Sequence, residues 1–229
     1  IFRERCRGMS WEINTARGFA LWSLLYRGEL AEAARRSDSH LRDARDRGDR
    51  FALCVLAGAL PNLVWLVRDD AAGARAVLAE AMSQWSRDGF HVQHYYELLA
   101  ATNIELYAGD GAAAWALLER RWPALQRSLL LQVQQVRLEL VGARARAALA
   151  AAAALPGQRA TLIDRAEADA RRLATLDMRR APAMAALIRA GVRRLTGDTA
   201  AAADQLGTAA AAFDAMDMQL HANAARRAL

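Results

Sequence analysis

The side chains with the most potential for chemistry are two histidines and a glutamate, spaced three residues apart. His91, His94 and Glu97 lie in a segment expected to be helical, so one helix face would hold all three. Imidazole and carboxylate groups arranged in this way can bind zinc. The spacing is not that of a known helical zinc motif and no fourth ligand is evident, so we expect no metal. The alternative is that His94 packs with Tyr95 and Tyr96 in a helix interface.

Other patterns typical of catalysis are missing from the sequence. It contains no glycine-rich phosphate loop, no nucleophile elbow and no cluster of metal ligands. Serines such as Ser23 and Ser128 have no evident histidine and aspartate partners. We therefore expect that the chain is not an enzyme and requires no cofactor.

The charged residues indicate a solvated surface more than a nucleic-acid interface. All 31 basic residues are arginine, the formal net charge is +6, and acidic residues are interspersed with the arginines, as in 42–47. Such mixing is typical of exposed helix faces. Adjacent pairs such as Arg171 and Arg172 recur, but neighbours on a helix point about 100° apart, so each pair is divided between two faces. Nucleic-acid binding is therefore not expected.

The composition predicts an all-α protein. Alanine makes up roughly a quarter of the 229 residues, and leucine and arginine are also frequent. These residues lose little side-chain entropy in a helix. β-branched residues are sparse, and no alternating apolar and polar stretch of useful length occurs.

The small number of cysteines favours a reducing compartment, and the apolar runs bear on contact with a membrane. Only Cys6 and Cys54 are present, too few for a disulfide framework. The chain begins at Ile1 without an initiator methionine or the apolar segment of a signal peptide, so we interpret it as part of a longer protein. No apolar run approaches the ~18 residues of a membrane span. We expect a cytoplasmic protein that does not contact a membrane.

Breaks in the apolar pattern divide the chain into helices. Aspartates at 49, 70, 110 and 198 are suited to N-cap positions, and Thr161 with Asp164 fits a capping box. Pro61 should kink the helix that contains it, and Pro123 should begin a short separate one. The helices expected are 11–27, 29–47, 49–67, 71–85, 91–107, 110–121, 123–128, 130–154, 162–176, 182–195, 198–216 and one from 218 onward.

The corners between these helices recur with a nearly constant period. Gly28 and Asp69 are 41 residues apart, and Asp69 and Gly109 are 40 apart. Gly109 and Gly157 are 48 apart, the excess matching the extra segment at Pro123, and Gly157 and Gly197 are 40 apart. The small residues Ala74, Ala114 and Ala202 follow the caps at 70, 110 and 198 by four positions, so the two helices of a hairpin can approach closely. One helical hairpin per ~40 residues is typical of an α-solenoid.

The corner Gly28-Glu29-Leu30-Ala31-Glu32-Ala33 resembles the turn of tetratricopeptide repeats. The period is longer than the ~34 residues usual in that family. It is similar to the longer tetratricopeptide-like hairpins in C-terminal regions of multidomain bacterial regulators, namely large serine/threonine kinases with an ATPase module and ATP-dependent maltose-type activators. Segments 60–66 and 85–96 look most like the kinase-linked version. The resemblance covers 10–216 and departs at Gln158, which stands where an aspartate is expected.

This resemblance implies a right-handed α-solenoid of about five antiparallel hairpins with a C-terminal capping helix, forming a single domain over 1–229. It also implies that the first helix of each hairpin lines a concave groove. The polar and aromatic candidates for binding a partner there are Trp22, Asn62, Tyr96, Asn103 and Gln135. Asn62 and Asn103 are 41 residues apart, so their amides could form a ladder that grips a peptide backbone. The alternative is that Asn62 satisfies backbone groups freed by Pro61.

The function expected from this resemblance is binding. The chain would be a protein- or peptide-binding scaffold of a cytoplasmic signalling protein, and its partners would include the kinase or ATPase domains of the same polypeptide. The maltose-type activators suggest a different class of function, a small-molecule sensor with a closed pocket among aromatic residues. A surface for self-association is a third alternative.

Overall fold

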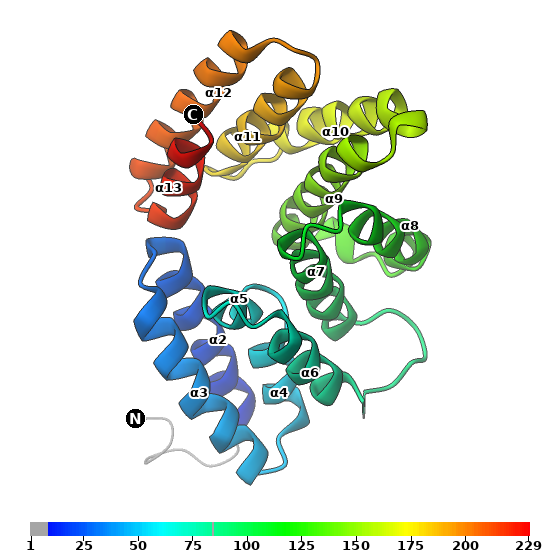
Figure 1. The fold of residues 1–229 in the computed structure, drawn as a ribbon. Coiled ribbons are helices and arrows are strands. Elements are labelled where there is room, and N and C mark those ends of the chain that lie inside the picture. The colour runs from blue at the N-terminus through cyan, green and yellow to red at the C-terminus, as the bar shows by residue number, and fades with distance from the viewer. Residues whose placement is uncertain (1–8, 84) are drawn as a thin grey trace. The chain divides into compact units, whose positions relative to one another are not determined.

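The computed structural model describes residues 9–83 and 85–229, and within them every regular element is helical (Figure 1). The all-α prediction is confirmed. Contacts divide the chain into two compact units, called unit 1 (through Ile104) and unit 2 (from Glu105). The expectation of one repeat domain over 1–229 stays a prediction. The elements are α2 (Ser10–Arg27), α3 (Leu30–Asp46), α4 (Arg50–Ala57), η1 (Leu60–Asn62), α5 (Leu63–Val67), α6 (Ala71–Met82), α7 (Val92–Tyr107), α8 (Gly111–Arg127), η2 (Leu130–Gln132), α9 (Gln134–Ala154), η3 (Pro156–Gln158), α10 (Arg159–Ala174), α11 (Ala181–Leu195), α12 (Thr199–Asp214) and α13 (Gln219–Ala228).

Unit 1 is built from helices that pack against their neighbours in sequence. Helix α2 contacts both α3 and α4, and α4 contacts both α3 and α6. The core between these helices is formed by large aliphatic side chains that are almost completely buried, among them Leu21, Leu25, Leu41, Leu56 and Ile104. Five consecutive or nearly consecutive residues of α4 are buried, namely Ala52, Cys54, Val55, Leu56 and Ala57, because α2, α3 and α6 all contact this helix.

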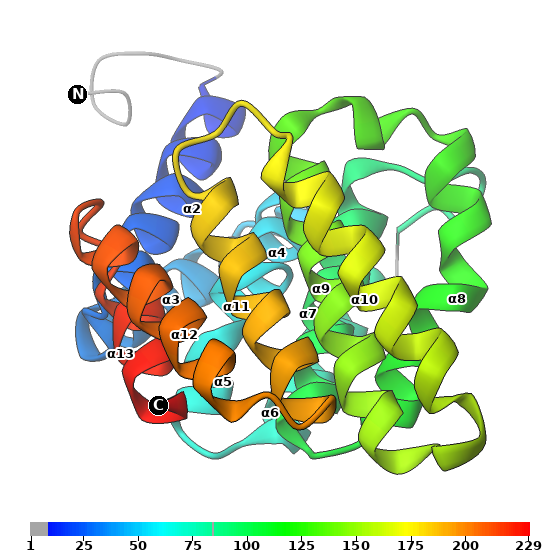
Figure 2. The same ribbon diagram turned by 90° about the horizontal axis from the view of Figure 1, so that it is seen from above.

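Unit 2 repeats this packing with smaller side chains. Helices α9, α10 and α11 contact one another, and α12 packs between α11 and α13 (Figure 2). Alanines fill the interfaces, and Ala147 and Ala151 of α9 and Ala170 of α10 are fully buried. A Cβ atom at Gly111 of α8 would lie 2.5 Å from the backbone of Ala150. The abundance of alanine and glycine is therefore explained by closely packed helices as well as by helix propensity.

The recurring corners share one backbone conformation. Gly28, Asp69, Gly109 and Gly197 have φ angles of 78°, 58°, 79° and 89°, all in the left-handed region. Only glycine adopts this region without strain, and aspartate is among the residues that tolerate it best. Gly157 is not among the glycines with positive φ, so the corner that departs from the resemblance also departs in conformation.

The aspartate that follows such a corner residue has two roles. The backbone N–H of Asp110 donates to the carbonyl of Glu105 at 2.9 Å, which closes the end of α7. Its side chain accepts from the N–H of Ala113 at 2.8 Å, which caps the start of α8. Asp49, Asp70 and Asp198 make the equivalent pairs of bonds, so all of the predicted aspartate caps are confirmed.

The helix expected over 49–67 is interrupted and bent just before Pro61. Helix α4 ends at Ala57, Ala59 has a φ of 45°, and the following segment is bent by 67°. The break occurs where the chain meets α7: the N–H of Ala59 donates to the carbonyl of Tyr96 at 2.9 Å. Pro61 then occupies the first turn of η1, where its missing N–H is not needed. The predicted bend at Pro61 is therefore present, and α4 ends at Ala57, the residue whose carbonyl an N–H at position 61 would have bonded.

Two local predictions were wrong. Pro123 lies inside α8, which continues to Arg127, because one lost backbone bond on an exposed face does not end a helix that is packed along its other side. Helix α10 begins at Arg159, directly after η3, and no side chain caps it. Thr161 and Asp164 are therefore inside the helix and do not form a capping box.

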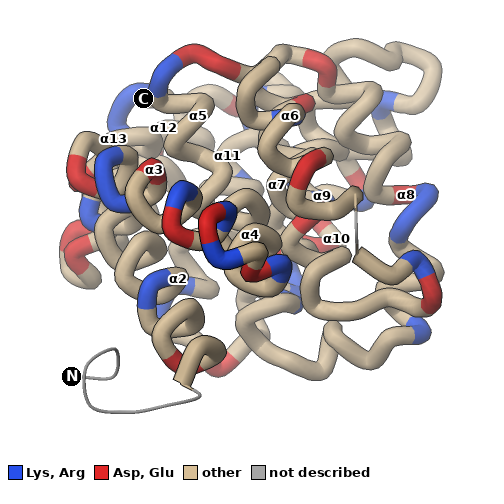
Figure 3. Tube along the Cα trace, turned by 90° about the horizontal axis from the view of Figure 1, so that it is seen from below, with Lys and Arg blue, Asp and Glu red and all other residues tan. Residues whose placement is uncertain are grey.

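Charged residues of both signs are interspersed along the helices of each unit, as α3 shows (Figure 3). Ion pairs such as Arg36–Glu32 and Arg68–Asp38 join neighbouring turns or neighbouring helices. Among the described residues, no single helix combines the length and the apolarity of a membrane span. One bent pair, Arg50–Ala57 with Leu60–Val67, reaches them only when its two parts are counted together.

Candidate functional site

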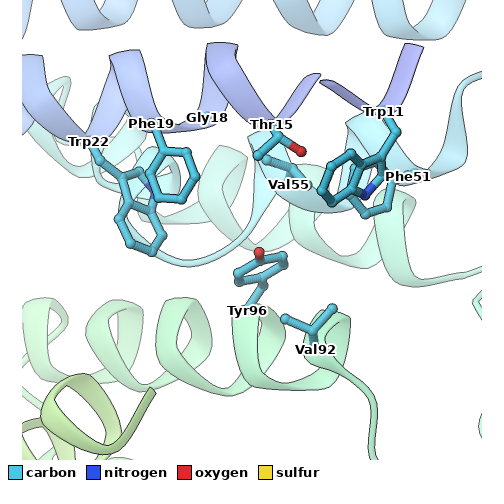
Figure 4. A pocket seen from close by; sticks show the side chains of 9 residues that line it. All are labelled: Trp11, Thr15, Gly18, Phe19, Trp22, Phe51, Val55, Val92 and Tyr96. Carbon is cyan, nitrogen blue, oxygen red and sulfur yellow. The ribbon is translucent and has the colours of Figure 1, made fainter. Parts of the chain in front are cut away.

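An aromatic pocket of about 220 Å³ lies within unit 1, between α2, α4 and α7 (Figure 4). Its walls come from three helices that are far apart in sequence. The lining residues are Trp11, Thr15, Gly18, Phe19, Trp22, Phe51, Val55, Val92 and Tyr96.

Helix α2 provides one long wall of the pocket. Its lining residues are spaced three, four or seven positions apart, as in Trp11, Thr15, Gly18 and Trp22, so they share one helix face. At Gly18 a Cβ atom would lie 2.8 Å from Cγ1 of Val55, so α2 and α4 are in close contact there. This contact closes the base of the pocket and leaves the larger side chains on either side of it.

Two large aromatic rings of α2 remain exposed at the pocket. Trp11 is 61% exposed and Phe19 is 60% exposed. Phe19 packs edge to face on Trp22, with ring centroids 5.8 Å apart. Single exposed apolar residues are common on protein surfaces, but several gathered around a hollow typically mark a binding surface.

Tyr96 on α7 forms the opposite wall. Its ring lies 5.0 Å from that of Tyr95, which is buried. A Cβ atom at Gly58 would lie 2.7 Å from the Cβ of Tyr96, and the Tyr96 carbonyl accepts the N–H of Ala59. The break after α4 therefore positions Tyr96, since only a glycine at 58 permits this approach of α7.

The pocket is apolar and uncharged. None of its lining residues carries a carboxylate, an amine, a guanidinium or an imidazole. The polar groups available are the Thr15 hydroxyl, the Tyr96 phenol and the indole N–H groups of Trp11 and Trp22. Such a lining favours an uncharged apolar group that carries at most a few hydrogen-bonding atoms.

The structure brings two of the five predicted partner-binding residues together, since Trp22 and Tyr96 line this pocket. Asn62 is 1% exposed, and its amide nitrogen donates to the carbonyls of Ala57 at 2.8 Å and Ala74 at 3.1 Å. These bonds match the alternative that the Asn62 side chain satisfies the backbone. Binding of a partner by Asn62 in a groove stays a prediction.

The other two predicted residues lie elsewhere. Asn103 is buried within α7, at 7% exposure. Gln135 is in unit 2, where its amide donates to Glu139 and accepts from Arg180. Their roles in binding stay predictions.

Sequence reasoning missed Trp11, Phe19 and Phe51 as pocket residues. A signal was present: the aromatic residues of 11–22 follow one helical face with Gly18 among them. Aromatic residues at helical spacing are usually core residues, and the sequence does not show which face of a helix a neighbour covers. The exposure of Trp11 and Phe19 distinguishes the two cases.

The histidine pair considered for zinc is engaged within the protein. The backbone N–H of His91 donates to Nδ1 of His94 at 2.9 Å, and Glu97 lies 3.6 Å from Arg87. Across residues 9–83 and 85–229, no group of three histidine, cysteine or acidic side chains is placed to hold a metal ion.

Cys54 is buried in unit 1, with its Sγ 3.4 Å from the carbonyl of Ala81. Burial, with a smaller contribution from the negative charge of Glu97, raises the pKa of the Cys54 thiol to about 12. A neutral thiol in these surroundings is a packing residue and a poor nucleophile. Cys6 lies outside the described residues.

Comparison of the chain with protein-family models, curated proteins and solved structures found no match.

Proposed function

We propose that this chain is a binding module that holds a peptide segment of a partner protein, with one large apolar side chain of that peptide inserted in the aromatic pocket. The observation that carries the proposal is the gathering of exposed rings from α2 around an uncharged hollow between α2, α4 and α7. Pockets for apolar anchors, lined by tryptophan and tyrosine, are where binding energy concentrates in protein interfaces.

The size of the pocket favours one side chain over a metabolite. Its volume of about 220 Å³ falls below the roughly 300–1,000 Å³ of typical small-molecule sites. The rings of Trp11 and Phe19 are open to solvent, whereas a sensor pocket would enclose its ligand. These observations favour a peptide over the alternative of a small-molecule sensor.

One inserted side chain does not account for the whole affinity. Burial of a leucine or phenylalanine contributes about 1.5–3 kcal/mol, whereas a micromolar complex requires about 8 kcal/mol. The exposed rings of Trp11 and Phe19 would supply further contact area along α2. We expect the bound segment to lie along this helix, with its anchor between Phe51 and Tyr96.

The finer architecture belongs to the same proposal. Recurring left-handed corners, aspartate caps and packing between next-but-one helices such as α9 and α11 support a solenoid of helical hairpins. We propose a right-handed, tetratricopeptide-like superhelix of about five hairpins with α13 as its cap. The resemblance of its corners supports a place in a larger cytoplasmic signalling protein, where the bound peptide could belong to an adjoining domain.

The experiment is selection from a displayed library of random peptides, followed by affinity measurements on the selected sequences. The expected result is peptides with one large apolar residue at a fixed position, whose replacement by alanine weakens binding about tenfold or more. Trp11→Ala and Phe19→Ala should weaken binding of the same peptides, and because both rings are exposed, neither variant should unfold the protein.

Tyr107→Ala is the matched control, because Tyr107 is an aromatic residue of α7 that is 47% exposed and does not line the pocket. It should bind like the wild type. Selected peptides that bind Trp11→Ala, Phe19→Ala and wild type equally would refute the assignment of this pocket.

A further inference from the structure

A second pocket, of about 320 Å³, lies within unit 2 and differs from the first in its chemistry. Helix α8 contributes one side, α9 contributes Arg144, and α10 contributes Arg165 and Arg172. The remaining lining residues, all from α8, are Glu119, Trp122, Pro123 and Gln126.

One arginine of this pocket is held rigidly. The guanidinium of Arg144 donates from Nε and Nη2 to the two carboxylate oxygens of Asp169, at 2.8 and 2.6 Å. The side chains of this pair are 3% and 0% exposed, and the Arg144 guanidinium carbon lies 3.5 Å from the centre of the Trp122 ring. The planar fork is therefore fixed by a bidentate ion pair and by an aromatic face.

The two arginines of α10 are available to a ligand. Nη1 of Arg172 is 3.4 Å from Oδ1 of Asp169, but Asp169 is already bound by Arg144, and the Arg172 side chain is 59% exposed. Arg165 is exposed and forms no ion pair with any residue that the structure describes. Three guanidiniums facing two carboxylates, Asp169 and Glu119, leave the pocket with a net positive charge.

The spacing of Arg165 and Arg172 suits a tetrahedral oxyanion. They are seven residues apart on α10, which places them on one face about 10 Å apart along the axis, a distance that two converging arginine side chains can span. A carboxylate has two oxygens in one plane, so it matches the paired N–H donors of a single guanidinium. A phosphate monoester has three acceptor oxygens, enough for two arginines and the amide of Gln126.

We propose that this pocket binds a phosphate group. Arg165 and Arg172 bind the phosphate oxygens, and the buried Arg144–Asp169 pair forms the floor of the pocket. The site is independent of the aromatic pocket, since all of its residues belong to unit 2. The phosphate is either a free ion or part of a phosphorylated peptide side chain.

The test is calorimetric titration of the 229-residue chain at low salt with inorganic phosphate, with a phosphoserine peptide, and with acetate. Saturable binding of a phosphate probe, more tightly than acetate, is the expected result. Arg165→Ala should weaken it about tenfold or more, as expected for loss of a charge-assisted hydrogen bond. Glu119→Gln should strengthen it, because removing a like charge from the pocket lowers the repulsion of the anion.

Arg171→Ala is the matched control. Arg171 is adjacent to Arg172 on α10, is 64% exposed and does not line the pocket, so its loss removes the same net charge without touching the site. If the phosphoserine peptide binds more tightly than inorganic phosphate, the natural ligand is a phosphorylated protein. If the two affinities are equal, the natural ligand is the free phosphate ion. The proposal is overturned by no saturable binding, by equal affinity for acetate, or by equal losses in Arg165→Ala and Arg171→Ala.

Discussion

The buried Arg144–Asp169 pair allows a quantitative prediction about unit 2. Arg144→Met retains the aliphatic stem but leaves Asp169, which is 0% exposed, without its bidentate partner. An uncompensated buried charge costs about 3–5 kcal/mol, because the lost attraction no longer offsets the desolvation of the carboxylate. Arg172 at 3.4 Å is a weak substitute, since its side chain is largely in water.

This free energy corresponds to a large change in melting temperature. Unfolding entropy is about 2.1 cal/mol/K per residue, so the residues from Glu105 to Leu229 contribute about 0.26 kcal/mol/K. If unit 2 unfolds separately, Arg144→Met should lower its Tm by about 11–19 °C; if the whole chain unfolds together, by about 6–10 °C. Circular dichroism at 222 nm during a thermal scan measures both the shift and the number of transitions.

A double-mutant cycle separates the pair from its surroundings. Asp169→Leu should destabilise by a similar amount, because it leaves Arg144 buried and unpaired, whereas the double variant Arg144→Met/Asp169→Leu should be more stable than either single variant. Arg171→Met is the control, because the Arg171–Glu167 contact of 3.8 Å is exposed and such a pair contributes at most about 1 kcal/mol. The reasoning would be refuted if Arg144→Met lowered the Tm by less than about 3 °C. It would also be refuted if the double variant lost as much stability as the two single variants added together.

Three further predictions concern a helix contact, a thiol and an amide. Gly111→Ala should destabilise by about 1–3 kcal/mol in urea unfolding, because its Cβ would lie 2.5 Å from the backbone of Ala150, whereas Gly207→Ala, with nothing within 4 Å, should stabilise slightly. Folding raises the pKa of Cys54 from 9.0 to about 12, so its stabilising contribution is complete below pH 9 and is lost as pH rises through 12; the stability difference between wild type and Cys54→Ala should narrow over this window. Asn62→Ala should cost about 1–3 kcal/mol, because the buried Ala57 carbonyl loses its side-chain donor and the Ala74 carbonyl loses its second one, without changing the affinity of a selected peptide. Weaker peptide binding by a folded Asn62→Ala protein would instead support the amide ladder.

The local chemistry of the corners could be predicted from the sequence. A glycine followed by an aspartate predicts a helix end and a new helix start, because glycine permits a left-handed backbone and aspartate caps the next helix. Gly109 with Asp110 and Gly197 with Asp198 fulfil both roles. These interactions span only a few residues, so a single sequence is sufficient to find them.

Features that depend on another helix could not be predicted in this way. Pro61 indicated a bend in its helix, but the contact of Gly58 and Ala59 with Tyr96 at that bend has no local signal. The burial of Arg144 with Asp169 was equally hidden, because a charged pair in the core has the same local pattern as one on a solvated face. Of the aromatic pocket, the sequence identified Trp22 and Tyr96, but not the exposed rings beside them.

The double role of the corner aspartates has a consequence for how local opening spreads. Because Asp110 bonds the end of α7 through its backbone and the start of α8 through its side chain, fraying of one helix end removes a bond from the next. Amide protons on the two sides of such a corner should therefore exchange with solvent as a coupled pair. The corner at Gly157 has no left-handed residue, and no side chain caps α10 after it. Openings at the end of α9 and the start of α10 should consequently be uncoupled, which makes this corner a boundary between dynamic segments.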